Sequence, residues 1–181
     1  MMIAKSSMIF RMVVAISLIQ TLLVLVTKAG GMENVTKVYT FVVDYSLPLK
    51  DAVKTGRYDH AEKNITDEHF PAKKDEQGLK EKSFTLYHFG YDTEYTESDW
   101  VIAQMNKDGN RPATIRELLA FAKANPDLQR NFPIVALRSV WVGLGRSRVA
   151  CLGGFSSGRA ISLRQLDTLW PGKSRFLAVS K

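Results

Sequence analysis

The chain has 181 residues, of which 45% are hydrophobic and 24% charged, a composition typical of one globular domain with a hydrophobic core and an end segment. The formal net charge of +7 permits anionic partners but does not require them. A single cysteine, Cys151, excludes an intramolecular disulfide bond, and the three histidines lack the spacing of metal ligands. The sequence therefore predicts neither a metal site nor a cofactor.

Residues 1–31 differ from the rest of the chain, because they contain no acidic residue and include an apolar run from Met12 to Val26. A basic start followed by about 15 apolar residues resembles a signal peptide, and the run is short for a membrane-spanning helix, which needs about 20 residues. Three interpretations are open: a cleaved signal, a retained membrane anchor, and a reading frame that extends upstream of the true start at Met32.

We favour a start at Met32, because a strand-like segment follows it directly and because an attached apolar leader would expose a large apolar surface or enter a membrane. The expected folded domain is then residues 32–181, and its expected location is the cytoplasm. The alternative is export, or anchoring in a membrane through Met12–Val26. A membrane is expected as a partner only if residues 1–31 are retained.

The first half of the expected domain alternates strands with helices. Residues 36–44 are β-branched and aromatic, which predicts a strand, and residues 83–91 predict a second one. Ser46 is expected to cap a short helix over residues 47–55. Residues 96–99 combine hydroxyl and acidic side chains and are expected to open another helix, which ends at Gly109.

The most strongly patterned stretch runs from Arg111 to Trp141. Thr114 and Glu117 have the spacing of a capping box, in which each side chain accepts a hydrogen bond from the backbone N–H of the other residue. We therefore interpret both as structural, and Glu117 as a cap rather than a catalytic acid. The helix is expected to end at Asn125, since a residue before proline is pushed out of the α conformation. The valine-rich run from Phe132 to Trp141 predicts a strand covered on both faces, and hence a central strand.

The remaining residues predict a β-meander, with strands over residues 147–152, 160–166 and 175–179 and a turn at Gly153-Gly154. Cys151 has apolar neighbours and is expected to be a buried strand residue rather than a reactive thiol. The expected fold is a single α+β domain, in which capped helices pack on a mostly antiparallel sheet with a C-terminal β-meander.

Three segments carry a resemblance to a known family. The chain reads Arg-Pro-Ala-Thr-x-x-Glu-Leu-Leu from Arg111, Phe-Pro-Ile-Val-Ala-Leu-x-Ser-x-Trp from Phe132, and Arg-Phe-Leu-Ala-Val from Arg175. Over residues 35–181 it resembles a family of bacterial proteins, many of them from candidate-phylum and environmental genomes, to which no activity is assigned. This resemblance therefore implies no function.

A weaker resemblance is to the C-type-lectin-like fold of the formylglycine-generating-enzyme type. That fold has an Arg-x-x-Thr-x-x-Glu helix start, here Arg111, Thr114 and Glu117, followed by a strand with a tryptophan, here Trp141. It closes on an Arg-Phe-x-x-Val strand, which begins here at Arg175. The paired cysteines of the enzyme and its calcium ligands have no counterpart in this sequence, so the resemblance implies a fold and not an activity.

Two classes of function fit the sequence. The first is a non-catalytic binding or structural module, whose Gly- and Ser-rich turns present a ligand surface to a protein or a glycan. The second is a nucleic-acid-binding accessory protein, because basic and aromatic residues alternate after Arg138 and only one acidic residue, Asp167, accompanies them. An enzyme ranks third, since no pattern indicates a catalytic group. The candidate ligand contacts are Arg146, Arg148, Arg159, Trp141 and Trp170.

Overall fold

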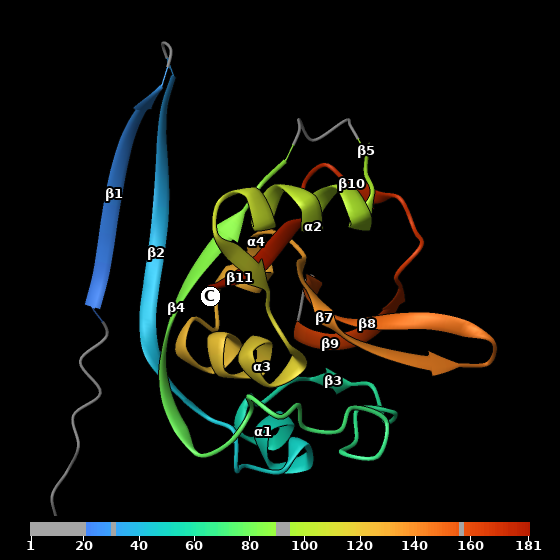
Figure 1. The fold of residues 1–181 in the computed structure, drawn as a ribbon. Coiled ribbons are helices and arrows are strands. Elements are labelled where there is room, and N and C mark those ends of the chain that lie inside the picture. The colour runs from blue at the N-terminus through green and yellow to red at the C-terminus, as the bar shows by residue number, and fades with distance from the viewer. Residues whose placement is uncertain (1–20, 30–31, 90–94, 156–157) are drawn as a thin grey trace, which may run out of the picture.

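A nine-stranded sheet with helices on both of its faces organises the described part of the chain (Figure 1). The computed structural model describes residues 21–29, 32–89, 95–155 and 158–181. The helices in these ranges are Leu49–Thr55 (α1), Ser98–Lys107 (α2), Ile115–Ala124 (α3) and Leu128–Asn131 (α4). The strands are Thr21–Ala29 (β1), Met32–Asp44 (β2), His60–Ala61 (β3), Leu79–Tyr87 (β4), Tyr95–Thr96 (β5), Asn110–Pro112 (β6), Ile134–Gly143 (β7), Arg146–Phe155 (β8), Gly158–Gln165 (β9), Trp170–Pro171 (β10) and Arg175–Ser180 (β11).

The strand order places β11 in the middle of the large sheet. The order is β1-β2-β4-β11-β7-β8-β9-β3, and β6 pairs with β11 as well. Neighbouring strands are antiparallel, except that β11 runs parallel to β7 and β3 runs parallel to β9. Strands β7, β8 and β9 form a meander, and the long β1–β2 hairpin stands at one edge (Figure 1). The expected meander is wrong in its last strand, because residues 175–179 belong to β11, which lies between β4 and β7 instead of beside β9. The prediction of a single α+β domain with a mostly antiparallel sheet is confirmed.

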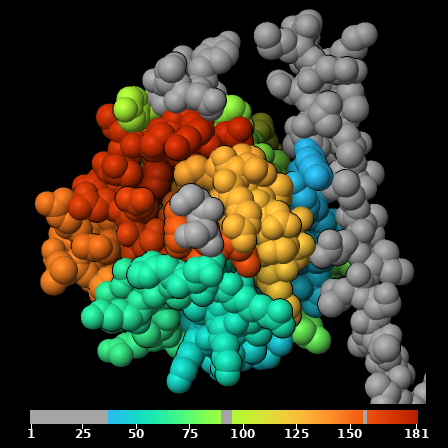
Figure 2. All heavy atoms as spheres, turned by 180° about the vertical axis from the view of Figure 1, so that it is seen from behind, coloured from blue at the N-terminus to red at the C-terminus, as the bar shows by residue number. Residues whose placement is uncertain are grey.

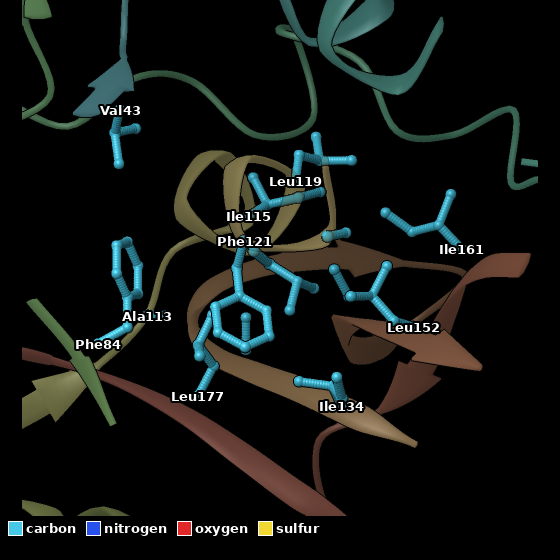
Figure 3. Close-up of a cluster of buried hydrophobic side chains, with 14 of the residues drawn as sticks. Val43, Phe84, Ala113, Ile115, Leu119, Phe121, Ile134, Leu152, Ile161 and Leu177 are labelled. Carbon is cyan, nitrogen blue, oxygen red and sulfur yellow. The ribbon is translucent and has the colours of Figure 1, made fainter. Parts of the chain in front are cut away.

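Side chains from the central strands point alternately to the two faces of the sheet and fill two cores. On one face, Leu119 and Phe121 of α3 pack over Leu152 and Leu177 of the sheet (Figure 3). On the other face, side chains of α2 pack against the alternate residues of the same strands, which include Val135 of β7, Cys151 of β8 and Phe176 of β11. The first half of β7 is buried on both faces, so its predicted position at the centre of the sheet is confirmed. Strand β11 is also buried and central, and the sequence did not predict its central position.

Two local predictions are wrong. Ser46 does not cap α1: its backbone N–H and hydroxyl donate to Asp44, while the Leu49 N–H donates to Asp67 Oδ2 at 3.1 Å. The second error concerns Gly153-Gly154, which continues strand β8 instead of forming a turn. A Cβ atom at Gly154 would lie 2.8 Å from the Cα of Arg130, so glycine is needed because α4 packs closely against the strand.

Most of the expected apolar leader lies in residues 1–20, outside the described residues. Its remainder contributes β1, which pairs with β2, so the sheet contains residues from both sides of Met32. In the described ranges, no helix combines the length and the apolar character needed to cross a membrane.

Candidate functional site

A broad recess lies on the α2 face of the sheet, over the second half of β8 and over β9. We call it the basic hollow; its volume is about 700 Å³. None of its lining residues comes from α2, so this part of the sheet face is not covered by that helix. Its walls come from α4 and from the segment between β9 and β11. In Figure 2, the yellow-orange α3–α4 segment and the orange-red C-terminal strands share one face of the molecule.

Small side chains form the floor of the basic hollow. Cys151 and Gly153 of β8 face it, beside Ala160 and Ser162 of β9, which are their partners in the strand register. A Cβ atom built on Gly153 would meet no heavy atom within 4 Å, so the space above this residue is open. The hollow therefore exists because two neighbouring strands carry small residues at the positions that face it.

Cations dominate the charge of the basic hollow. Arg130 of α4, Arg164 of β9 and Lys173 line it together with His60, and no aspartate or glutamate is among the described residues that line it. Arg130 also lies 3.5 Å from Asp127, but both side chains are exposed, and such pairs contribute little. A cluster of like charges around a recess raises the local concentration of ions of opposite charge. The hollow is therefore suited to an anion.

Apolar groups stand beside these cations. Phe155, at the end of β8, is 50% exposed, and Leu169, in the segment between β9 and β11, is 55% exposed. Phe132 is partly buried and has the Arg175 guanidinium carbon 4.7 Å from its ring centroid. Exposed aromatic and aliphatic groups next to cations suit a ligand that carries rings as well as negative charge.

The wall on the α4 side is held by a buried hydrogen-bond network. Gln129 donates from Nε2 to the carbonyl oxygens of Gly153 and Ala160, at 2.7 and 3.1 Å. Its Oε1 accepts a hydrogen bond from Arg159, which also donates to the Gly56 carbonyl at 2.8 Å. These bonds join α4, β8, β9 and the end of α1, so this wall is fixed by the fold before any ligand arrives.

Cys151 lies in the floor, but its thiol is not poised for nucleophilic chemistry. The residue is 5% exposed, and its Sγ donates a weak hydrogen bond to the Leu152 carbonyl at 3.4 Å. Burial raises the pKa of the thiol to about 12, although the charge of Arg164 acts in the opposite direction. The thiolate is the reactive form of cysteine, so this residue serves as a small floor residue at neutral pH.

The five candidate contacts from the sequence lie in different environments. Trp170 lines the basic hollow, is 3% exposed and donates from Nε1 to Ser98 Oγ at 2.8 Å. Arg159 is 7% exposed and belongs to the network behind the hollow. Trp141 stacks on His69, with 4.4 Å between the ring centroids.

The remaining two, Arg146 and Arg148, lie at the start of β8, toward the tip of the β7–β8 hairpin. Arg146 is exposed and donates to Gln165 Oε1 at 3.0 Å, and Arg148 is the strand partner of Trp141. The Cα register places Arg148 opposite Gln165 and Arg159 opposite Gly154, so the β8–β9 pair holds these two arginines toward its opposite ends. The structure therefore does not gather the five residues at one place.

Thr114 and Glu117 form the reciprocal hydrogen bonds of a capping box at the start of α3. The Glu117 carboxylate has no exposed surface, and it also accepts two hydrogen bonds from Arg111, at 2.6 and 2.8 Å, and one from Tyr45. Burial raises the pKa of Glu117, but the bonds and charge of Arg111 outweigh burial and hold it below its ordinary value. This carboxylate is ionised, saturated with donors and closed to solvent, which suits a structural role.

Sequence reasoning pointed to the basic C-terminal region but did not select the cations that line the hollow. Arg164 and Lys173 belong to that region, and the β-strand alternation of Cys151 with Gly153 and of Ala160 with Ser162 was a usable signal for a small-residue floor. Arg130 carried no such signal, because its position depends on how α4 packs against β8.

No group of three or more potential metal ligands occurs within the ranges that the structure describes. No protein family model matches the sequence, and comparisons with curated proteins and with solved structures give no match either.

Proposed function

We propose that this domain is a non-catalytic binding module and that the basic hollow is its ligand-binding surface. The observation that carries the proposal is the lining of the hollow: Arg130, Arg164 and Lys173 stand around a floor of small side chains without a carboxylate among the described lining residues. Ligand sites in proteins are concave and combine apolar surface with a few polar or charged groups that orient the ligand. The ligand class supported by these charges is an anion.

Single-stranded nucleic acid is the anionic ligand that these features favour. Proteins that bind single strands combine a positively charged groove for the phosphates with exposed aromatic rings on which the bases stack. Phe155 is half-exposed beside the cations and offers such a ring. Arg146 and Arg148 are not part of this surface, because strand alternation places them on the side of β8 that carries Leu152, opposite to the floor of the hollow. An acidic glycan or an acidic protein segment is the alternative ligand.

The first experiment is a titration of the protein with a fluorescent mixed-sequence DNA single strand at several salt concentrations, read by anisotropy. Replacing a cation that neutralises a phosphate lowers the salt dependence of affinity, by about 0.7 in the logarithmic slope for each phosphate of a single strand. The double variant Arg164→Ser/Lys173→Ser should bind more weakly and show this smaller slope. The matched control, Lys50→Ser/Lys107→Ser, removes two exposed lysines that do not line the hollow and should bind like the parent.

Two results would count against the proposal. If the parent does not bind the strand at low salt, nucleic acid is excluded, and the acidic alternatives are tested by direct titration with fluorescently labelled heparin and polyglutamate. If both double variants lose equal affinity, the binding reflects net charge rather than the hollow. Arg159 is left unchanged in these tests, because it is buried and its replacement would disturb the fold.

The compartment in which the module acts depends on residues 1–31. With translation starting at Met32 we expect it in the cytoplasm, where nucleic acid is accessible. N-terminal sequencing of the native protein, combined with cell fractionation, distinguishes this from a cleaved signal or a retained membrane anchor.

A further inference from the structure

A second, smaller cavity lies on the opposite face of the sheet, between α1 and α3 and the end of β2, and its volume is about 210 Å³. Its apolar walls come from Phe41 of β2, Leu119 of α3 and Leu47, which precedes α1. The space remains open because alanines occupy the facing helix positions, Ala52 on α1 and Ala120 and Ala124 on α3. The cavity does not share a lining residue with the basic hollow.

The size of the cavity selects a small molecule rather than a protein segment. An apolar cavity of about 150 Å³ in a protein interior can hold one benzene molecule, so this cavity has room for a short hydrocarbon chain. Two of the apolar side chains that line the cavity are buried, since Phe41 is 7% exposed and Leu119 is 2% exposed. A chain that enters would therefore exchange water for preformed apolar contacts.

Two cations on one face of α3 line the same cavity. Arg116 is 7% exposed and uses two of its nitrogens, donating to the Leu47 carbonyl at 3.0 Å and to Asp67 at 2.5 Å. Its third nitrogen, Nε, is buried and has no hydrogen-bond partner among the described residues. Lys123, two turns further along α3, is exposed at the rim. An unpartnered buried donor and an exposed ammonium group therefore border one apolar space.

The acidic groups nearby are already engaged. Asp67 accepts hydrogen bonds from Arg116 and from the N–H of Leu49 at the start of α1. Asp44, which lines the rim, accepts two bonds from Ser46, which lower its pKa. Asp44 faces Lys123 closely enough to interact with its charge, yet forms no ion pair of 4.0 Å or less with it in the described structure. Lys123 thus retains capacity for a further anion.

We propose that this cavity binds a small carboxylic acid with an apolar chain. The chain packs between Phe41, Leu119 and the alanines of α1 and α3, and the carboxylate lies at the rim between Lys123 and Arg116. This site is independent of the basic hollow, and the two can be tested separately because they lie on opposite faces of the sheet.

The test is a titration of ¹⁵N-labelled protein with hexanoate, hexanol and acetate, followed by amide chemical shifts. Hexanoate should produce saturable shifts at Ala52, Ala120 and Lys123. Hexanol lacks the charge and should bind on the order of fivefold more weakly, as expected for a partly exposed ion pair. Acetate lacks the chain and should produce no saturable shift at these residues.

Three variants locate the site. Ala120→Leu fills the cavity with a good helix former and should abolish saturable binding; Thr55→Phe, at the exposed rim, obstructs the same space if the first variant does not fold. Lys123→Gln should reduce hexanoate affinity toward that of hexanol, because Arg116 remains as the second cation, and should leave hexanol binding unchanged. The matched control, Lys107→Gln, removes an exposed lysine on α2 and should bind like the parent. The proposal fails if hexanoate does not shift the cavity amides, if hexanol equals it in the parent, or if a folded cavity-filling variant binds it undiminished.

Discussion

Replacing Glu117 with glutamine removes one charge from a carboxylate that has no exposed surface, while keeping the shape of the side chain. In the parent, the carboxylate accepts two bonds from Arg111, one from the Tyr45 hydroxyl and one from the Thr114 backbone N–H. Glutamine presents an NH₂ group where one of the carboxylate oxygens now accepts hydrogen bonds. At least one of these donors then loses its partner, and the Arg111 charge, with its side chain 15% exposed, loses its counter-ion.

The expected cost is about 3 kcal/mol in the free energy of unfolding at neutral pH. Removing the charge of one partner of a buried ion pair costs about 3–5 kcal/mol of stability. We expect the lower value of this range, because the Arg111 side chain is 15% exposed and keeps some contact with water. Urea denaturation followed by circular dichroism measures this difference. The matched control is Asp75→Asn, which breaks the Arg138–Asp75 ion pair. Its N–O distance is 2.8 Å, close to the 2.6 Å of Arg111–Glu117, but its side chains are 27% and 49% exposed, so the change should cost less than about 1 kcal/mol.

The stability difference between the parent and Glu117→Gln should also depend on pH, in a direction that the structure determines. The pKa of Glu117 is lowered in the folded protein, so its carboxylate stabilises the fold at any pH above the unfolded value of about 4.3. That contribution is lost as the pH falls toward the folded pKa. The stability difference between the parent and Glu117→Gln should therefore be constant near neutral pH and shrink below about pH 4.3. A Glu117→Gln cost no larger than that of Asp75→Asn, or a difference that grows in acid, would refute this account.

Three further predictions concern two substitutions and the reactivity of one cysteine. Thr114→Ala removes the hydroxyl that accepts the Glu117 N–H bond and should lower stability by about 1 kcal/mol, measured by urea denaturation, without changing binding to the oligonucleotide. Leu144→Asn should raise stability by about 1 kcal/mol, because Leu144 has φ 54° at the hairpin tip, where asparagine is better tolerated, and is 92% exposed. Cys151 should react slowly with a thiol reagent at pH 8 in the native protein and rapidly in urea, since its thiol is buried and its pKa is raised.

Local signals in the sequence predicted the helices and strands whose boundaries depend on nearby residues. The start of α3 at the Thr114–Glu117 box and its end before Pro126 follow from bonds and steric contacts within a few residues. The same holds for β7, because burial on both faces leaves a continuous apolar run. The cap of α1 was not predictable in this way, since its acceptor, Asp67, lies beyond the end of the helix in sequence.

The candidate site depends on contacts that no local pattern records. Gly153-Gly154 has the composition of a turn, but both residues belong to a strand. Gly154 allows α4 to approach β8 closely, and Gly153 leaves open space above the floor of the basic hollow. The cations of the basic hollow come from α4, β9 and the segment before β11, so their proximity is a product of tertiary packing. The sequence predicted a surplus of positive charge in this region, but not the position of the recess that concentrates it.

The central place of β11 affects the order in which the fold can be completed. This strand comes after every other strand in the sequence, yet it lies between β4 and β7 and pairs with both. During synthesis, the β7–β8–β9 meander can form from neighbouring segments, whereas β2 and β4 have no link to it within the sheet until β11 emerges. Until that moment, one edge of β4 and one edge of β7 are open to pairing with other chains, which is a recognised route to aggregation. A chain cut before residue 175 would therefore contain two half-sheets with exposed edges, because β11 is the strand that joins them.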